Sequence, residues 1–206
     1  MQSLLIALAL LATVQPAVAQ SAPAPKFVVG DTWTFKSGSE TREATVLKVE
    51  PGAIEVSGLF FQCPACRVVI DDNINPQTLL DASGKPIDVV QFGFVPIGGS
   101  WKFWDVPLEV KKRWEFATTG FSRGRTANYV VTNVVEKIED VKTPAGVFKT
   151  YKIQRDWIIK AEAQTRVSDG RWTTTTWYAP DARMYVKSAS TAANAREWEL
   201  TSLSLK

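Results

Sequence analysis

Residues 128–162, NYVVTNVVEKIEDVKTPAGVFKTYKIQRDWIIKAE, carry the clearest strand–turn–strand pattern in the chain. Residues 128–142 are rich in β-branched side chains, which favour strands over helices. The tetrad Thr143-Pro144-Ala145-Gly146 suits a type I turn, because proline presets φ at the second position and glycine is tolerated at the fourth. The pattern therefore predicts two long antiparallel strands joined by a tight turn.

The second of these strands, residues 147–162, has two different faces, because side chains of a strand alternate between the two sides of a sheet. One side carries the apolar residues together with two cations of the same parity: Tyr151, Ile153, Trp157, Ile159, Lys149 and Arg155. The other side carries Lys152, Gln154, Asp156 and Lys160. We therefore expect a mainly apolar face that charged groups interrupt.

Shorter strand patterns, separated by turn residues, flank this hairpin on both sides. The expected strands are residues 28–36, 41–49, 53–61, 172–178, 184–188 and 196–205, with turns at 168–170 and 179–181. In the first of them, Trp33 and Phe35 share one face. Consecutive strands with tight connections usually pair with one another, so we expect an antiparallel meander in one mainly β domain, residues 27–206.

The region from residue 71 to residue 110 is the least predictable, because turn residues interrupt every periodic pattern. The best helix candidates are residues 75–82 and 106–112. We expect at most one or two short helices in the whole chain.

The N-terminal segment has the features of an export signal. Residues 3–14 are uncharged and mostly apolar, a length typical of a signal peptide and short of the roughly 20 residues that span a bilayer. Ala17-Val18-Ala19 is a small-residue cleavage motif. We expect a signal peptide at residues 1–19, a linker at 20–26, and a periplasmic or secreted protein that is not transmembrane after cleavage.

The composition excludes several classes of function. The chain has 206 residues, with 24 Lys and Arg, 21 Asp and Glu, and no histidine. Catalytic triads and metal sites that need imidazole are therefore excluded. The net charge of +3 is too small to indicate nucleic-acid binding. We expect a protein that is not an enzyme, with no metal, no cofactor and no nucleic-acid partner.

Cys63-Pro64-Ala65-Cys66 holds both cysteines of the chain. In an exported protein such a pair favours a disulfide. A redox-active pair is a weaker alternative, because its first cysteine belongs at a helix N-terminus and here strand patterns lie on both sides. Arg67 keeps that alternative open, since its charge favours a thiolate at Cys66. A zinc site needs four ligands, and this motif supplies two.

Eight tryptophans are the other unusual feature. Most are expected in the core of the sheet, and some are candidates for lining a ligand site. In Trp101-Lys102-Phe103-Trp104, a strand would place Trp101 and Phe103 on one face and Trp104 on the other, with at least one ring at a surface, rim or partner contact. The candidate ligand-binding residues are Trp33, Trp101, Trp104, Tyr151, Trp157 and Trp177.

Five motifs resemble a family of exported bacterial proteins of unknown function: residues 29–33 (VGDTW), 106–114 (VPLEVKKRW), 143–149 (TPAGVFK), 177–180 (WYAP) and 199–202 (ELTS). That family is similar in architecture to periplasmic lipoprotein-carrier and lipid-carrier proteins. The resemblance implies a single curved antiparallel sheet, a half-barrel or incomplete barrel, around an apolar cavity. It brings no catalytic residues. Lys112-Arg113 and the region of Cys63 and Cys66 depart from the family pattern.

These features together predict an exported, non-catalytic binding protein of the periplasm or cell envelope. Its ligand would be an acyl chain or another apolar group in an aromatic-lined cavity of the sheet. Three alternatives remain: a scaffold that contacts an envelope protein through residues 101–104, a thiol–disulfide protein that uses Cys63 and Cys66, and a carbohydrate-binding protein with exposed tryptophans.

Overall fold

The computed structural model describes residues 21–59, 65–87, 95–99, 101–122, 125–160, 170–193 and 195–206. Twelve strands form one antiparallel sheet in the order β6-β5-β4-β3-β2-β14-β13-β12-β11-β10-β9-β7. Neighbours in the sheet are mostly neighbours in sequence, so the predicted meander and the mainly β fold class are confirmed.

The strands are β2 (Thr32–Ser37), β3 (Glu40–Glu50), β4 (Ala53–Ser57), β5 (Arg67–Ile70), β6 (Pro76–Leu80), β7 (Val95–Gly99), β9 (Arg113–Ser122), β10 (Arg125–Thr143), β11 (Gly146–Lys160), β12 (Arg171–Ala179), β13 (Met184–Ser190) and β14 (Trp198–Ser204). A further short pair joins β1 (Ser21–Ala22) to β8 (Leu108–Glu109). Part of the segment expected as a linker is therefore paired with the domain, and its Ala22 is buried.

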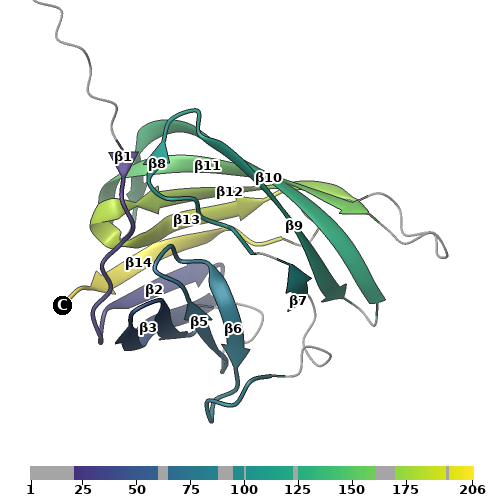
Figure 1. Ribbon diagram of the computed structural model, residues 1–206. Coiled ribbons are helices and arrows are strands. Elements are labelled where there is room, and N and C mark those ends of the chain that lie inside the picture. Colours follow the sequence, from purple (N-terminus) through teal and green to yellow (C-terminus); the bar gives the residue numbers. More distant parts are fainter. Residues whose placement is uncertain are drawn as a thin grey trace, which may run out of the picture.

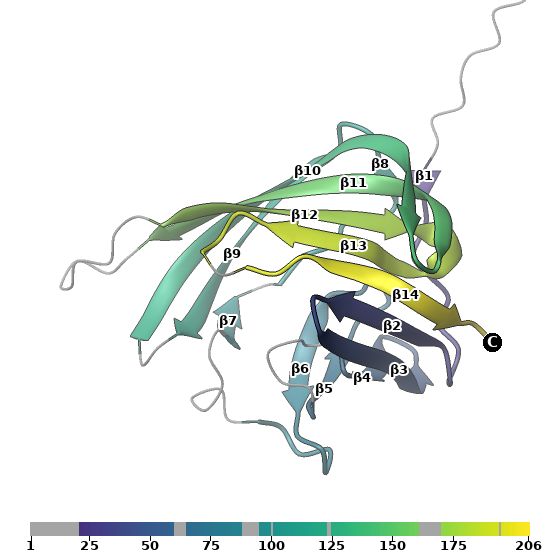
Figure 2. The same cartoon turned by 180° about the vertical axis from the view of Figure 1, so that it is seen from behind.

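The sheet is strongly curved, as Figures 1 and 2 show. Strands β9 to β13 arch over the molecule, and β2 to β6 continue the same sheet around its lower side. Strands β6 and β7 lie at opposite ends of the strand order, so the sheet is an incomplete barrel with a concave inner face.

The β10–β11 hairpin is part of the arch, and its two strands and turn are the ones that residues 128–162 predict. Thr143 pairs with Gly146 across the two-residue turn, and the register continues to the pair Asn128–Lys160. A bulge between Val135 and Lys137 shifts the register by one residue. Bulges bend strands and increase their twist, so this position contributes to the curvature of the arch.

Both helix candidates are wrong. Residues 75–82 contain β6, and residues 106–112 contain the short β8. Lys111 has a positive φ of 73°, which interrupts a right-handed helix. Among the described residues the structure has one helical turn, the 3-10 turn η2 (Pro180–Ala182), and no helix long and apolar enough to cross a bilayer.

The strand expected at residues 53–61 ends earlier, and the reason is local. Gly58 follows β4 with a positive φ of 67°. A Cβ at this position would lie 1.8 Å from the carbonyl oxygen of Glu43, so the close approach of the two backbones requires glycine.

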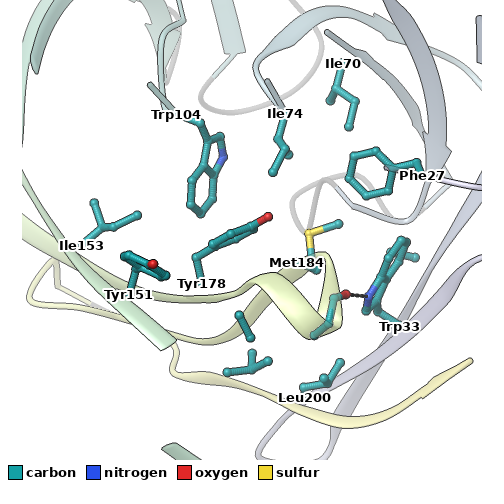
Figure 3. Close-up of a cluster of buried hydrophobic side chains, with 14 of the residues drawn as sticks. Phe27, Trp33, Ile70, Ile74, Trp104, Tyr151, Ile153, Tyr178, Met184 and Leu200 are labelled. Atoms are coloured by element: carbon teal, nitrogen blue, oxygen red, sulfur yellow. Dashed lines mark hydrogen bonds between the residues drawn. The ribbon is translucent and has the colours of Figure 1, made fainter. Parts of the chain in front are cut away.

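The main core lies between the arch and β2 to β5 (Figure 3). Trp33 is completely buried there, and its indole Nε1 donates a hydrogen bond of 2.7 Å to the carbonyl oxygen of Ala182. Asp31 is also completely buried and accepts hydrogen bonds from the Val28 amide, the Arg183 guanidinium and the Lys206 amide. These contacts connect the residue before β2 to the last residue of the chain.

Candidate functional site

A row of polar side chains crosses the concave face of the arch. Asn133 on β10 lies directly opposite Arg155 on β11, and Arg155 lies directly opposite Thr174 on β12. On its own strand, each of the three residues lies an even number of positions from a buried residue: Val131, Ile153 or Tyr178. Their side chains therefore lie on the interior face of the sheet. We call Asn133, Arg155 and Thr174 the polar row.

On one side of the polar row, six aromatic side chains pack together. This aromatic cluster comprises Trp101, Phe103, Phe116, Tyr129, Trp157 and Trp172. Trp157 and Trp172 stack with ring centroids 5.4 Å apart, and Phe116 and Tyr129 meet Trp157 edge to face. The main core, with Trp104, Tyr151 and Tyr178, lies on the other side of the row.

Residues 101–107 cover this part of the concave face without forming a strand. The Asn75 side chain holds the segment by two hydrogen bonds: the Trp104 amide donates to Asn75 Oδ1 over 2.8 Å, and Asn75 Nδ2 donates to the Trp104 carbonyl over 3.1 Å. Trp114 Nε1 donates to the Lys102 carbonyl over 2.8 Å. At the edge, Asp105 pairs with Lys102 and Lys112. We call residues 101–107 the cover segment.

Arg155 is the central group of this arrangement. Its side chain is buried, with the residue 5% exposed. Nη1 donates to Thr176 Oγ1 over 2.6 Å and Nη2 donates to the Phe103 carbonyl over 3.1 Å. The guanidinium carbon lies 4.9 Å from the ring centroid of Trp104 and 5.6 Å from that of Phe103. Every one of these partners is electrically neutral.

The charge of Arg155 is therefore poorly compensated. Among the described residues no carboxylate pairs with it, and its Nε has no hydrogen-bond partner. Burial lowers the pKa of Arg155 to about 10, so the side chain is still protonated at neutral pH. Asn133 Oδ1 and the Tyr178 hydroxyl are likewise buried without a hydrogen-bond partner in the described part of the chain. These groups offer a bound molecule unused hydrogen-bond donors and acceptors.

The six candidate ligand-binding residues do not form one site. Trp101 and Trp157 belong to the aromatic cluster, whereas Trp104 and Tyr151 lie in the main core beside it. Trp33 also lies in the main core, against η2, and Figure 3 shows it apart from Trp104 and Tyr151. Trp177 lies on the opposite face of β12 from Tyr178, where its Nε1 donates to Glu139 over 2.9 Å and Lys187 lies over its ring.

The expectation of a strand at residues 101–104 is wrong, because these residues belong to the cover segment. Trp101 and Trp104 are 9% and 6% exposed, whereas Phe103 is half-buried and is the ring nearest to the expected rim position. Sequence reasoning also missed Asn133, Phe116, Tyr129 and Trp172. Arg155 had a signal, because it shares the parity of Ile153 and Trp157 on an otherwise apolar face.

Cys66 precedes β5 and is 3% exposed. Cys63 and the turn at residues 168–169 lie outside the described residues, as do residues 1–20. The Cys63–Cys66 disulfide and the signal peptide therefore stay predictions. Among the residues that the structure describes, no three His, Cys, Asp or Glu side chains are grouped to hold a metal ion.

No known family model and no curated protein matches the chain in sequence. Similar solved structures include a Bacteroides fragilis protein with a YmcC-like fold, described as exported, at 15% identity and a TM-score of 0.48, covering 89% of this chain and 99% of that one. The hypothetical lipoprotein YmcC from Escherichia coli has 13% identity and a TM-score of 0.49, covering 85% and 83%. A Parabacteroides distasonis protein, described as a lipoprotein, has 12% identity and a TM-score of 0.47, covering 90% and 100%.

Proposed function

We propose that this chain is an exported, non-catalytic binding protein of the periplasm or cell envelope, and that it takes an acyl chain or another apolar group on the aromatic cluster. The signal peptide predicted at residues 1–19 supports export. The aromatic cluster supplies a contiguous apolar surface on the concave side of the sheet.

One observation carries the proposal: the aromatic cluster is closed by the cover segment and not by a strand. The described hydrogen bonds that hold this segment come from side chains, those of Asn75, Lys112, Trp114 and Arg155, and not from a strand ladder. Displacing it therefore leaves the pairing of β9 to β12 intact. Segments held by few contacts open at lower free energy than the strands of a core, so the rings beneath are accessible to a ligand.

The alternatives have less support. A scaffold contact through residues 101–104 needs exposed rings, but Trp101 and Trp104 are buried. A thiol–disulfide activity needs a first cysteine at a helix N-terminus, but the described elements on either side of the motif, β4 and β5, are strands. Carbohydrate stacking needs an exposed indole face, and the described tryptophans are buried or half-buried.

The test is binding of the neutral apolar dye N-phenyl-1-naphthylamine to the purified, delipidated protein. Trp172 and Trp177 make a matched pair, because both are half-buried on β12 and they lie on opposite faces. We expect Trp172→Ala to weaken dye binding about fivefold, the value of one aromatic contact, and Trp177→Ala to leave it unchanged. Absence of dye binding, or an equal loss in both variants, contradicts the proposal.

A further inference from the structure

The buried guanidinium of Arg155 needs an explanation that the apolar site alone does not give. A cation removed from water is costly unless it is paired and fully hydrogen-bonded. Within the described residues, Arg155 has two neutral oxygen acceptors and two aromatic ring faces, and its Nε has no acceptor. An arginine that served only to hold the cover segment would have no need of a charge in this position.

The groups beside Arg155 offer further unused hydrogen-bonding capacity. Asn133 lies directly opposite it on β10, with its Oδ1 unpaired and its Nδ2 at 3.4 Å from the Trp114 carbonyl. The unpaired Oδ1 of Asn133 is an acceptor and cannot bind an oxyanion, whereas the guanidinium presents only donors, in a planar fork that matches the two oxygens of a carboxylate or phosphate. The edge of Arg155 that carries the unpaired Nε therefore has the donor geometry of an oxyanion site.

This oxyanion site is continuous with the aromatic cluster. Phe103 contacts both: its ring centroid lies 5.6 Å from the guanidinium carbon of Arg155 and 5.9 Å from the Trp157 ring centroid. Trp157 follows Arg155 by two residues on the same face of β11. A molecule with an apolar chain on the cluster thus has its end group next to Arg155.

The geometry points to an anionic amphiphile as the ligand: an apolar chain lies on the aromatic cluster, and its terminal oxyanion, a carboxylate or a phosphate, pairs with Arg155. This inference rests on the proposed function and narrows its ligand class. An oxyanion at Nε and Nη2 competes with the Phe103 carbonyl, and charge-assisted hydrogen bonds are about twice as strong as neutral ones. Binding of the head group therefore releases one contact of the cover segment.

The test compares three ligands of equal chain length at pH 8: dodecanoate and dodecyl phosphate, each below its micelle concentration, and the neutral dodecanol, below its solubility limit. For the wild-type protein we expect one or both anions to bind at least about tenfold more tightly than dodecanol. The tighter of the two anions identifies the head group as carboxylate or phosphate.

Two variants locate the preference. Arg155→Met should remove it while changing dodecanol affinity by less than about twofold, because methionine keeps the apolar volume. Arg155→Lys should retain part of it, because lysine keeps the charge and loses the planar fork. Arg171→Met is the control, since Arg171 is an exposed cation on β12 next to Trp172, and it should leave the preference unchanged.

The outcomes separate the two proposals. Equal binding of all three ligands to the wild-type protein overturns the oxyanion site and leaves the proposed function standing. An anion preference that survives in Arg155→Met also overturns it, because the head group then lies elsewhere. Absence of binding by all three ligands overturns both proposals. If Arg155→Met does not fold, Arg155→Lys locates the preference: an undiminished preference in that variant overturns the oxyanion site.

Discussion

The region around Trp33 and the region around Trp157 belong to the same sheet but satisfy their polar groups differently. Around Trp33, the buried carboxylate of Asp31 has three donors and the indole has its acceptor. Around Trp157, Arg155 Nε and Asn133 Oδ1 are buried with no hydrogen-bond partner among the described residues. Trp33 lies on a strand that is paired on both sides and packs against Phe27 and η2, whereas the second region is covered by residues 101–107.

The difference separates a stabilising role from a binding role. A buried polar group without a partner costs free energy of folding, so its retention indicates a role other than stability. The polar atoms of Trp33 and Asp31 themselves are all paired. We therefore expect substitutions there to affect stability most, and substitutions around Arg155 to affect ligand binding most.

The largest expected effect is that of Trp33→Ala. Trp33 is completely buried between paired strands, so its truncation leaves a cavity that cannot collapse, at a cost of about 4 kcal/mol. Trp101→Ala should cost only about 2 kcal/mol, because the cover segment can relax into the space. Urea unfolding of both variants measures the difference. If the two costs are equal, the aromatic cluster is a second rigid core and the comparison fails.

Removal of the Asp31 carboxylate should have the next largest effect. Asp31→Ala leaves the Arg183 guanidinium and two backbone amides without their acceptor, which should cost about 3 kcal/mol. Asp181→Ala, which removes an exposed carboxylate two residues from Arg183, is the matched control and should change stability by less than about 0.5 kcal/mol. Similar losses in both variants would show that surface charge, and not the buried network, is responsible.

The contact of Asn75 with the cover segment gives a smaller expected effect, of about 2 kcal/mol. Asn75→Ala removes both hydrogen bonds to Trp104 and leaves a buried amide and a buried carbonyl unpaired. Amide hydrogen exchange should then accelerate at Trp104 and not at Trp33. Asn73→Ala, an exposed asparagine of the same loop, is the control. Equal acceleration at both tryptophans would mean that the two regions open together.

The strands could be predicted because their information is local. The β-branched run, the turn at Thr143 to Gly146 and the alternation along residues 147–162 depend only on near neighbours in sequence, and β10 and β11 follow them closely. The parity of Arg155 with Ile153 and Trp157 was visible, but Lys149 has the same parity and is exposed, so parity alone does not identify the buried cation.

The division of the tryptophans could not be predicted, because it depends on contacts between distant residues. Trp104 is held by Asn75, which lies 29 residues away, and Trp33 by Ala182, 149 residues away. The curvature of the sheet decides which buried ring belongs to which region, and no local pattern records it. The wrong helix prediction at residues 75–82 has the same cause. Asn75 bonds to Trp104 of the cover segment, and β6 follows it in place of a helix.

Arg155→Met should change stability little, and in the favourable direction. The variant removes an unpaired buried charge and keeps the apolar stem, so we expect a gain of about 1 kcal/mol, reduced by the loss of the Phe103 and Thr176 contacts. Urea unfolding measures it. A loss above about 3 kcal/mol would show that Arg155 is a structural residue like Asp31, and the two regions would then not differ in role.

The smallest expected effect concerns the pH dependence of the cover segment. Burial alone would raise the pKa of Asp105, but hydrogen bonds and charge from Lys102 and Lys112 outweigh it and hold the pKa below its ordinary value. A lowered folded-state pKa means that the contribution to stability is complete above about pH 4, the ordinary value for aspartate, and is lost as the pH falls through the folded value. Because these ion pairs are partly exposed, the loss should be less than about 1 kcal/mol.

Urea unfolding at pH 6 and at pH 3 measures this loss. The free energy of unfolding should decrease slightly less for Asp105→Asn than for the wild-type protein, and 1 M salt should reduce the difference, because it screens exposed pairs. Amide exchange at Trp104 should accelerate in acid before exchange at Trp33 does, since only the cover segment is held by these pairs. If the free energy of unfolding depends on pH equally in Asp105→Asn and in the wild-type protein, the acid sensitivity belongs to other carboxylates. Lowering the pH then does not open the cover segment selectively.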